Sequence, residues 1–598
     1  MADTKTTGGL YVGTDKHRWW KEAVVYQVYP ASFLDTNGDG WGDVPGITAK
    51  LDHLKTLGVD VIWVSPIYKS PQADMGYDIA DYEDIDPIYG TLADVDYLIK
   101  EIKKRDMKLV MDLVVNHTSD QHDWFIDSRS SKESSKRDWY IWKPAKYDKD
   151  GNRQPPNNWA QILGEANSAW TWDEKSGEYY LSLFTPEQPD LNWESPAVRE
   201  AVHHVLRFWL DRGASGFRMD VINLISKVQS FPDAETTVPN NKYQPGHKHF
   251  ANGPRLHEFL KDINREVLSK YDTITVGEMP FVRDEDEIIR VVGAESGELN
   301  MIFAFDIVDI DNVPGDFKYT LYPWDARDLK RIVNRLQRLM LERDGWNSLF
   351  IENHDQPRSI SRYTDDSDQW RDYGARLLCL MQTTLAGTLY VYQGEEIGMR
   401  NVPESWGKEE YKDIESINFF KKYEQMYPGD EEKLAYGRKI MQRKARDNAR
   451  TPVQWDTSAH AGFTSASSTP WMRVNDDYKD INVARQFSDP NVITSVFAFW
   501  KRALANRKQH KDIFVYGDFG LIDAEHEKVV AYKRWSADEA VVVVLNLSGK
   551  EIEWKGIGSL KVKKWWAGNY DEKDLGEKAK EGTIVLRPWE GLIGGLEE

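Results

Sequence analysis

Short apolar segments alternate with longer amphipathic segments along most of the chain. The apolar runs at residues 24–29, 59–65 and 108–115 are typical of buried strands. Residues 47–57 and 92–105 lie between them and carry apolar side chains at the spacing of a helix. Strands that alternate with helices in this way predict βα units around a parallel sheet.

The same alternation continues further along the chain. Residues 201–212 are predicted to be helical, because their apolar side chains recur three and four residues apart. Strand-like runs follow at residues 216–221 and 273–278. The number of such units favours a closed (β/α)8 TIM barrel over an open sheet, so the expected fold class is α/β.

Three segments depart from this alternation. Residues 118–189 are too long for a simple loop and predict an inserted small domain after the third strand. A charged insertion lies near residues 399–442, and residues 516–598 predict a C-terminal antiparallel β-sandwich domain. The barrel is then expected to comprise residues 1–117 and 190–515. The C-terminal strands are expected at residues 529–535, 540–547, 551–554 and 583–588.

The charge balance narrows the choice of partners. The chain has 598 residues, with 77 Lys and Arg against 97 Asp and Glu, so its formal net charge is −20. Nucleic acids and anionic membrane surfaces bind basic faces, and we expect neither as a partner. The chain also holds 24 Trp and 28 Tyr. Such rings suit stacking on sugars and equally suit a large core, so composition leaves both interpretations open.

The cysteine content and the termini bear on location. Cys379 is the only cysteine, which is typical of a reducing compartment. Residues 1–10 lack the apolar segment of a signal peptide, and no stretch reaches the roughly 18 apolar residues of a membrane span. We therefore expect a cytoplasmic protein without a membrane partner, as a monomer or a weak homo-oligomer.

Polar residues end several of the predicted strands. They are residues 112–117, Arg218 with Asp220, Glu278, and His354 with Asp355. In a barrel, catalytic groups lie at the carboxyl ends of the strands. One buried carboxylate there can be a structural acceptor, whereas three acids with two His and one Arg at one end favour a functional site.

Glycoside hydrolysis is the chemistry that suits these residues. It needs one carboxyl that stays protonated to assist the leaving oxygen and a second that stays ionised. Arg218 and Asp220 are two residues apart, so on a strand they face the same side, where the guanidinium would keep Asp220 ionised. Glu278 follows the apolar residues 274–276, and such surroundings favour the protonated form.

The motifs around these residues resemble the α-amylase superfamily of retaining glycosidases. Its four signature regions resemble DLVVNH (112–117), GFRMD (216–220), GEM (277–279) and NHDQPR (353–358). Three further stretches are similar to its oligo-1,6-glucosidase branch: DMGYDIA (74–80), QPDLN (188–192) and ARTPVQW (449–455). The resemblance extends over residues 20–589, in particular to fungal and bacterial α-glucosidases, isomaltases and oligo-1,6-glucosidases.

This resemblance implies roles for individual residues. Asp220 would be the nucleophile that forms a β-glucosyl-enzyme, Glu278 the general acid and base, and Asp355 the group that stabilises the transition state. The implied substrate-binding residues are Asp74, Tyr77, His117, Phe184, Arg218, Val221, His354, Arg446 and Arg450. Among these, Tyr77 would stack beneath the sugar. Because the family retains configuration, the carboxyls of Asp220 and Glu278 should be about 5–5.5 Å apart.

A loop near the N-terminus carries oxygen ligands at alternating positions between glycines, which suits a hard cation. An EF-hand is disfavoured, because its twelfth position would be Gly46 and a strand precedes the loop. The resemblance implies a structural Ca²⁺, or Mg²⁺, held by Asp35, Asn37, Asp39, the Trp41 carbonyl and Asp43. We expect this site on the opposite side of a strand pair from the acids. The alternative is an Asx-rich turn without metal.

The residue after the nucleophile bears on linkage. In the resembled branch, Val at the position of Val221 accompanies action on α-1,6 bonds without excluding α-1,4 bonds. We expect an exo-acting α-glucosidase that releases glucose from the non-reducing ends of short oligosaccharides. Glucosyl transfer stays open, because it uses the same acids. Sucrose isomerisation is disfavoured, since residues 309–319 hold a single cation, Lys318. A transporter heavy chain would need a membrane segment and would have lost the acids.

Overall fold

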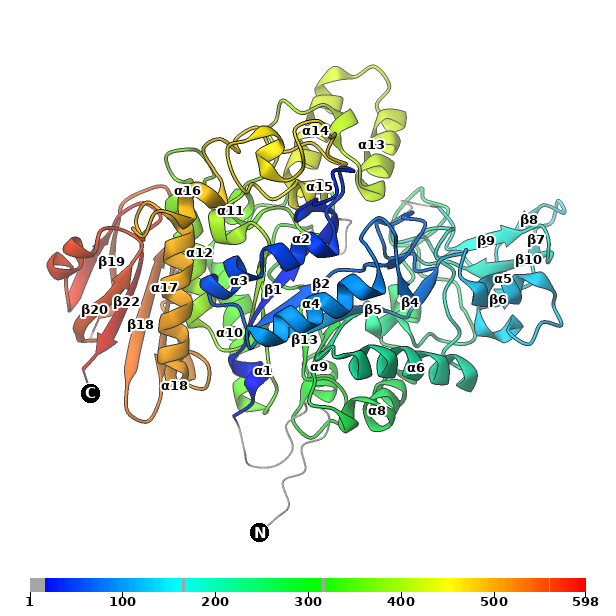
Figure 1. Ribbon diagram of the computed structural model, residues 1–598, viewed down its shortest axis with the longest axis horizontal. Coiled ribbons are helices and arrows are strands. Elements are labelled where there is room, and N and C mark those ends of the chain that lie inside the picture. Colours follow the sequence, from blue (N-terminus) through cyan, green and yellow to red (C-terminus); the bar gives the residue numbers. More distant parts are fainter. Residues whose placement is uncertain (1–16, 164–166, 314–317, 559, 598) are drawn as a thin grey trace, which may run out of the picture.

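The computed structural model describes residues 17–163, 167–313, 318–558 and 560–597. Its centre is an eight-stranded parallel sheet in the order β13-β12-β11-β5-β2-β1-β15-β14 (Figure 1). The strands are β1 (Val24–Val28), β2 (Val61–Val64), β5 (Lys108–Val114), β11 (Gly216–Asp220), β12 (Ile274–Glu278), β13 (Met301–Phe303), β14 (Ser348–Leu349) and β15 (Thr388–Tyr392). A parallel bridge between Ile302 and Asn347 joins the two ends of the sheet, so the sheet closes into the predicted barrel.

Eight helices follow the barrel strands and cover the outside of the sheet (Figure 1). They are α3 (Leu51–Leu57), α4 (Leu92–Lys104), α6 (Pro196–Arg212), α8 (Leu256–Glu266), α9 (Glu285–Val292), α10 (Ala326–Glu342), α12 (Arg371–Thr384) and α17 (Val496–Gln509). The helix predicted at residues 47–57 is two helices, α2 (Val44–Ala49) and α3, because the backbone departs from helical geometry at Lys50. Further short helices are α1 (Trp19–Glu22), α7 (His247–Phe250), α11 (Ser359–Tyr363), α15 (Asp447–Arg450), α16 (Val483–Phe487) and α18 (Lys511–Phe514).

Alternation of side chains along the strands separates an outer layer from the barrel interior. On β1, Val24 and Tyr26 pack in the layer beneath the helices, whereas Val25 packs inside the barrel. On β11, Phe217 and Met219 lie in the outer layer. The residues between and after them, Arg218 and Asp220, therefore point into the barrel. The same alternation turns Asp112 and Glu278 inward, next to Val110 and Val276 of the inner cluster.

The inserted segment after β5 forms a small layer of its own, seen beside the barrel in Figure 1. It contains α5 (Asp123–Ser130) and an antiparallel sheet in the order β6-β10-β9. The strands of this segment are β6 (Trp142–Lys143), β7 (Lys146–Tyr147), β8 (Arg153–Gln154), β9 (Trp170–Asp173) and β10 (Glu178–Leu181). A bridge between His117 and Asp190 joins its start to its end. Both ends thus lie at the carboxyl end of β5.

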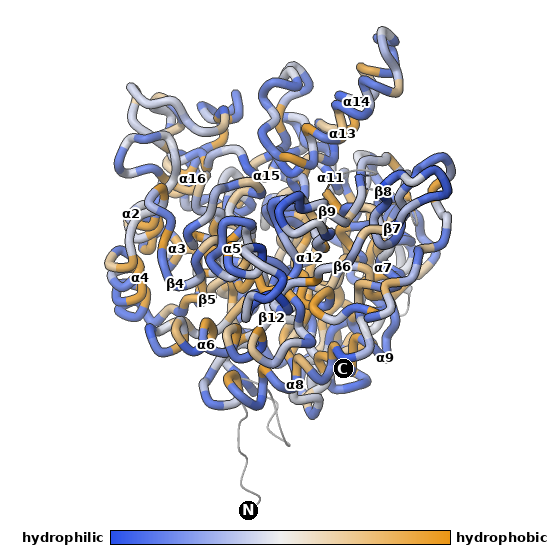
Figure 2. Tube along the Cα trace, turned by 90° about the vertical axis from the view of Figure 1, so that its right-hand side faces the viewer, coloured by the Kyte–Doolittle hydropathy of each residue, from blue (hydrophilic) through white to orange (hydrophobic). Residues whose placement is uncertain are grey.

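The charged insertion after β15 forms two helices, α13 (Ile414–Met426) and α14 (Glu431–Lys444). They pack against each other through Tyr423 and Gly437, and a buried cluster around Phe419 and Ile440 lies at their base. Figure 2 shows this pair extending from the same side of the barrel as α15. The insertion therefore stands at the carboxyl ends of the strands.

The C-terminal part has a five-stranded antiparallel sheet, β16-β17-β18-β22-β20, and a two-stranded one, β19-β21. The strands are β16 (Asp518–Ile522), β17 (Val529–Trp535), β18 (Ala540–Asn546), β19 (Ile552–Gly558), β20 (Val562–Gly568), β21 (Gly582–Leu586) and β22 (Gly591–Leu596). On β18, Val541 and Val543 join the barrel core, whereas Val542 and Val544 pack with the second sheet. The large sheet is therefore buried on both faces, which agrees with the predicted sandwich.

In the part of the chain that the structure describes, no helix is both long and apolar enough to cross a membrane. The prediction for residues 1–10 lies outside the described residues.

Candidate active site

Three buried carboxylates share one guanidinium inside the barrel. Asp112, Arg218 and Glu278 stand on the adjacent strands β5, β11 and β12, and pairing sets Arg218 beside Asp112. Arg218 Nη1 lies 2.9 Å from Asp112 Oδ1 and 2.7 Å from Asp220 Oδ1, while its Nη2 binds Glu278 Oε2. We call Asp112, Arg218, Asp220 and Glu278 the Arg218 cluster. Because β11 and β12 are adjacent strands, the predicted acids Asp220 and Glu278 meet at this guanidinium.

Burial raises the pKa values of Asp220 and Glu278 to different levels. Burial raises the pKa of Glu278 to about 8, and the neighbouring charges of Asp220 and Asp355 also raise it. Burial raises the pKa of Asp220 to about 6, against the attraction of Arg218. From the sequence, Arg218 was expected to act on Asp220 alone, and a raised pKa of Asp220 was not expected. Arg218 is shared among three carboxylates, so its positive charge offsets only part of the free energy lost when each carboxylate is removed from water. Near pH 7 Asp220 is still mostly ionised and Glu278 mostly protonated.

The backbone turns sharply just after Asp220. Val221 has φ 34° and ψ 41°, in the left-handed region that β-branched residues rarely adopt. Its N–H lies 3.4 Å from Glu278 Oε2. Strained conformations of this kind concentrate at functional sites, where the surrounding structure holds them in place. Val221 is therefore fixed close to both predicted catalytic acids.

A second charged cluster lies beside the first. Arg450 Nη2 is 2.7 Å from Asp355 Oδ1, and Arg446 Nε is 3.2 Å from the same oxygen. Both arginines belong to the region of α15, one helical turn apart. Arg450 Nη1 also lies 2.7 Å from Asp413 Oδ2, and Arg446 Nε is 3.3 Å from Glu415. We call Asp355, Asp413, Glu415, Arg446 and Arg450 the Arg446–Arg450 cluster.

The cations of this cluster set the charge of Asp355. Although burial opposes ionisation, Arg446 and Arg450 hold the pKa of Asp355 well below its usual range. Asp413 is likewise buried, and Arg446 and Arg450 lower its pKa. Lys318 Nζ donates to the Asp355 carbonyl at 2.8 Å. Asp355 is therefore a carboxylate that stays ionised, in contrast to Glu278.

Asp74, His117 and Gln188 form the next part of the site. Gln188 Nε2 donates to Asp74 Oδ2 at 3.1 Å and lies 3.2 Å from His117 Nε2. Arg446 Nη1 is 3.5 Å from Asp74 Oδ1, which has no hydrogen-bond partner among the described residues. Burial raises the pKa of Asp74 to about 7. The Phe184 ring lies 5.0 Å from that of His117. Asp74 Oδ1 is therefore a buried acceptor that a sugar hydroxyl can use.

Tyr77 and His354 contact each other closely, although both were predicted to contact the sugar. Their rings are stacked at 5.3 Å with an interplanar angle of 8°, and the Tyr77 hydroxyl lies 2.6 Å from His354 Nε2. His354 Nδ1 is 2.8 Å from Gln27 Nε2, so both ring nitrogens have protein partners. Stacking of Tyr77 on sugar would use the ring face away from His354, and it stays a prediction.

Four residues contact the predicted site residues and were not among them. Asp112 and Gln188 stand inside the motifs DLVVNH and QPDLN, so their positions were a usable signal. Asp413 and Glu415 lie in the charged insertion. No local pattern distinguishes them from the solvated charges around them, and only the fold brings α13 against α15.

The predicted metal loop is held by its own hydrogen bonds. Asp35 accepts from the backbone of Asn37, Gly38 and Gly40. Asp43 accepts from the N–H of Thr36 at 2.8 Å and from Gly46 at 2.6 Å, and so caps α2.

The remaining ligands of the loop likewise bond within it. Asn37 accepts from the N–H of Asp39, and Asp39 accepts from the N–H of Trp41. Within the described ranges, no group of three or more His, Cys, Asp or Glu side chains is arranged to hold a metal ion. The oxygens suit a hard cation chemically, and bound Ca²⁺ stays a prediction.

The expected position of this loop was wrong. It follows the carboxyl end of β1, and Ser32, just before it, donates to the Arg450 carbonyl at 2.5 Å. The loop therefore lies at the same end of the barrel as the acids, not on the opposite side of a strand pair. The error arose because the chain reverses after β1 before α2 begins.

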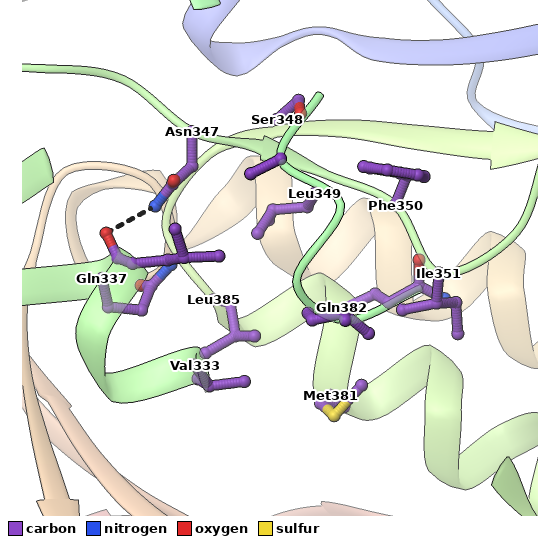
Figure 3. Close-up of a pocket in the computed structure, with 13 residues that line it drawn as sticks. Val333, Gln337, Asn347, Ser348, Leu349, Phe350, Ile351, Met381, Gln382 and Leu385 are labelled. Atoms are coloured by element: carbon purple, nitrogen blue, oxygen red, sulfur yellow. Dashed lines mark hydrogen bonds between the residues drawn. The ribbon is translucent and has the colours of Figure 1, made fainter. Parts of the chain in front are cut away.

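A small cavity lies elsewhere in the barrel. It has a volume of about 30 Å³ and is lined by residues of α10, α12 and the segment around β14, among them Val333, Leu349 and Leu385 (Figure 3). None of the predicted site residues lines it. Room for a water or two between apolar side chains marks an internal void, not a substrate site.

Comparison with known proteins agrees with this geometry. Residues 27–517 match the family model of the alpha amylase catalytic domain. The chain belongs to the alpha-amylase family. This confirms the resemblance inferred from the motifs, and the ordered acids and the closed barrel are those of a glycoside hydrolase of that family.

Individual members of the alpha-amylase family match nearly the whole chain. It is 51% identical to an alpha-glucosidase of Schizosaccharomyces pombe, over 90% of this chain and 92% of that protein. It is 50% identical to an oligo-1,6-glucosidase of Parageobacillus thermoglucosidasius, over 96% of this chain and 98% of that protein.

Solved structures of the family show the same fold. An isomaltulose synthase of Erwinia rhapontici NX5 matches with a TM-score of 0.90 and 39% identity, over 98% of this chain and 100% of that one. A trehalose-6-phosphate hydrolase of Bacillus licheniformis matches with a TM-score of 0.87 and 43% identity, over 97% and 100%. The fold is therefore shared by members that differ in substrate.

Proposed function

We propose that the protein is an exo-acting retaining α-glucosidase that releases glucose from the non-reducing ends of short α-glucosides. The observation that carries this proposal is the Arg218 cluster. It binds Asp220 and Glu278 to one guanidinium and leaves them with opposite protonation near neutral pH. Two carboxyls on one guanidinium support the retaining mechanism, in which the two acids are closer together than in inverting enzymes.

The first step forms a glucosyl-enzyme. An Asp220 oxygen attacks the anomeric carbon as the glycosidic C–O bond breaks, and Glu278 gives its proton to the departing oxygen. Water then attacks the same carbon. Glu278, now a carboxylate, takes the proton of that water, and the bond to Asp220 breaks to release glucose. Asp220 starts and ends as a carboxylate, and Glu278 starts and ends protonated.

Asp355 supplies the charge that this reaction needs at its transition state. The developing oxocarbenium ion is positive, so a neighbouring carboxylate that cannot take up a proton stabilises it. The Arg446–Arg450 cluster keeps Asp355 in that form. The proposed reaction thus uses a protonated acid, Glu278, from the Arg218 cluster and an ionised acid, Asp355, from the Arg446–Arg450 cluster.

Exo action is part of this proposal, because the resemblance implies that Asp74 and Arg450 bind the non-reducing end of the substrate. Both side chains are buried, at 5% and 2% exposed. The free acceptor on Asp74 would bind a hydroxyl of the terminal glucose. A chain held by its terminal glucose in this way would be cleaved one residue at a time.

Both α-1,6 and α-1,4 bonds are proposed substrates. The relatives named oligo-1,6-glucosidase and alpha-glucosidase support each, and Val221 stands at the position that the resemblance links with α-1,6 bonds. Glucosyl transfer to a second sugar is a further proposed outcome, because it differs only in what attacks the glucosyl-enzyme. The prediction against sucrose isomerisation rests on residues 309–319, of which residues 314–317 lie outside the described residues.

Product analysis tests this function directly. The purified protein is incubated with maltose, isomaltose, sucrose and trehalose 6-phosphate, each at low and high concentration, and products are separated and quantified. We expect glucose from isomaltose and maltose, with longer saccharides at high concentration only. Isomaltulose from sucrose, or glucose 6-phosphate as the main product, would assign another activity. An Asp220→Asn control separates this activity from contaminants.

The proposed Ca²⁺ site has an independent test. Metal analysis of the purified chain, before and after dialysis against EDTA, measures the ions per molecule and the change in melting temperature. One Ca²⁺ per chain, lost together with stability and also lost in an Asp39→Ala variant, supports the site. No metal in the untreated protein would favour the Asx-rich turn.

The cytoplasmic location and the monomeric or weakly oligomeric state also remain proposals. They rest on the sequence features described above. Sedimentation velocity of the purified chain and fractionation of the source cells are the measurements that check them.

A further inference from the structure

Lys227 is a buried lysine that the proposed chemistry does not use. It lies in the segment after β11, three residues beyond Leu224, and is 1% exposed. Its Nζ lies 3.0 Å from Asp190 Oδ2 and 3.0 Å from Asn116 Oδ1, and it donates to the Leu224 carbonyl at 2.6 Å. An ammonium group has three donors and no acceptor, and these three oxygens satisfy all of them.

The lysine determines which way the Asn116 side chain faces. Because Lys227 can only donate, the Asn116 atom beside it must be the oxygen. The amide nitrogen is then on the other side, where it donates to Asp190 Oδ2 at 3.0 Å and approaches His117 Nδ1 at 3.2 Å. A reversed amide would set N–H against the ammonium and oxygen against the carboxylate. Both charged neighbours therefore select the same orientation.

The orientation of Asn116 in turn determines the tautomer of His117. Its Nδ1 accepts from the Asn116 amide, so the ring proton is on Nε2. That nitrogen donates to the Tyr77 carbonyl at 3.1 Å. The Gln188 amide nitrogen, also close to Nε2, uses a hydrogen for Asp74 Oδ2. Burial lowers the pKa of His117 to about 3, and the charge of Lys227 lowers it further, so the ring is neutral.

We propose that Lys227 is a positioning residue, which acts through Asn116 to keep the proton of His117 on Nε2, the nitrogen nearest Asp74. This inference rests on the proposed function, in which His117 and Asp74 bind the terminal glucose. With the proton on Nε2, His117 donates to the Tyr77 carbonyl, and Asp74 Oδ1 remains the unpartnered acceptor for the sugar. With the proton on Nδ1, the Nε2 lone pair would face the Tyr77 carbonyl oxygen, and the repulsion would displace the ring from this end of the site.

The same lysine also balances the charge of Asp190. The other oxygen of this carboxylate accepts from the N–H of Leu183 at 2.9 Å, next to Phe184. Asp190 is completely buried, and Lys227 is its ion-pair partner. The charged groups that face His117 are therefore Lys227 with Asp190 on one side and Asp74 beyond Gln188 on the other. One ion pair links the end of β5, the inserted segment and the turn after β11.

An isosteric variant tests the tautomer directly. Asn116→Asp keeps an oxygen towards Lys227 but replaces the nitrogen that donates to His117 Nδ1 and to Asp190 Oδ2 with an acceptor. This change should move the ring proton to Nδ1. The readout is the pair of ¹⁵N shifts of His117 in histidine-labelled protein, assigned by their absence in a His117→Gln variant. We expect an Nε2–H ring in the wild type and an Nδ1–H ring in Asn116→Asp.

The kinetic consequence is measured with maltose. In Asn116→Asp we expect kcat/KM to fall at least tenfold. We also expect its pH profile to gain an acid-side ionisation absent in the wild type, because the new carboxylate stabilises a charged His117. Lys227→Met, which removes the ammonium but keeps the length of the side chain, should lower kcat/KM in the same direction.

Lys330→Met is the matched control for burial. Lys330 is 0% exposed and donates to the carbonyls of Asp523 and His526, far from the acids in the fold. It should lower the melting temperature as Lys227→Met does, and leave the kinetics and the His117 shifts unchanged. Equal kinetic losses in both variants would show that Lys227 acts only through stability, and would overturn the inference.

The inference and the proposed function can fail separately. An Nδ1–H ring in the wild type, or unchanged shifts in Asn116→Asp, overturns the role of Lys227 even if the protein hydrolyses maltose. A wild type that releases no glucose from any α-glucoside overturns the proposed function, whatever the His117 shifts show.

Discussion

The two charged clusters of the site contain similar carboxylates and shift the pKa values of these carboxylates in opposite directions. The Arg218 cluster has three buried acids for one guanidinium, and the pKa values of Asp220 and Glu278 are both raised. The Arg446–Arg450 cluster has two guanidiniums, assisted by Lys318, and the pKa of Asp355 falls well below its usual range. Burial acts in the same direction in both. The ratio of cations to carboxylates therefore decides which acid can carry a proton.

This difference fits the chemistry that each cluster has to perform. A general acid must be protonated in the resting enzyme, and a site with few cations provides that. A transition-state stabiliser must not take up a proton, and a site with many cations prevents it. The predictions below change one cluster at a time.

The largest effect is expected for Asp220→Asn, which removes the proposed nucleophile from the Arg218 cluster. Activity on maltose should fall below a thousandth of the wild type, about 4 kcal/mol of barrier. The control is Asp112→Asn, because Asp112 binds the same nitrogen of Arg218 without a proposed bond to the sugar. Initial rates of glucose release compare the two. Equal losses would show that the cluster acts only as a charge network.

Glu278→Gln should cost about a hundredfold or more on maltose, because the leaving oxygen is no longer protonated. The loss should be much smaller on 4-nitrophenyl α-glucoside, whose leaving group needs no proton. In the wild type, kcat/KM should fall as pH drops through the raised pKa of Asp220, about 6, since protonation removes the nucleophile. It should also fall as pH rises through that of Glu278, about 8, since ionisation removes the acid.

The alkaline decline should therefore be absent in Glu278→Gln. A variant that keeps this decline would assign it to another group and would contradict the protonation order of the cluster.

Arg450→Met should make the second cluster resemble the first. Removal of one cation raises the pKa of Asp355, so this carboxylate takes up a proton at higher pH. The acid-side decline of kcat/KM, which Asp220 sets in the wild type, should therefore become steeper. We expect a loss of roughly ten- to hundredfold near neutral pH. Arg450→Lys keeps the charge and should keep the wild-type slope, with a loss that reflects the missing N–H contacts. A wild-type slope in Arg450→Met would refute the role of the cation ratio.

The smallest effect is expected for Val221→Thr, which changes no charge in either cluster. The ratio of isomaltose to maltose hydrolysis should shift a fewfold towards maltose, because one methyl replaced by hydroxyl discriminates only modestly. Both limbs of the pH profile should stay in place. A constant substrate ratio would remove Val221 from the determinants of linkage, and shifted limbs would show that it also tunes the acids.

The Arg218 cluster was accessible to sequence reasoning, and the Arg446–Arg450 cluster was only partly so. Arg218 and Asp220 are two residues apart on a strand, and Glu278 ends the next strand, so local rules place all three inside the barrel. Arg450 was implied by a motif. Its partner Asp413 lies 37 residues away in a charged insertion, where solvated and buried acids look alike in sequence.

The C-terminal strands show the same limit. The valine-rich strand β18 was predicted closely, whereas β22 (Gly591–Leu596) was missed because glycine is unfavourable in strands. In the structure the rings of Trp565 and Trp566 lie over Gly594 and Gly595, where a Cβ atom would approach them within 2.8 and 2.5 Å. Glycine is thus required by its neighbours, a reason that no window of sequence contains.

The sequence by itself determined the barrel and the family and predicted the three acids, because strand periodicity and contiguous motifs are local properties. Only the tertiary structure decided how many cations each acid receives, and hence which acid is protonated. It also decided that Lys227 meets Asn116, 111 residues earlier in the chain. Electrostatic energies depend on distances between side chains and on their exclusion from water, and folding sets both after the sequence has chosen the residues.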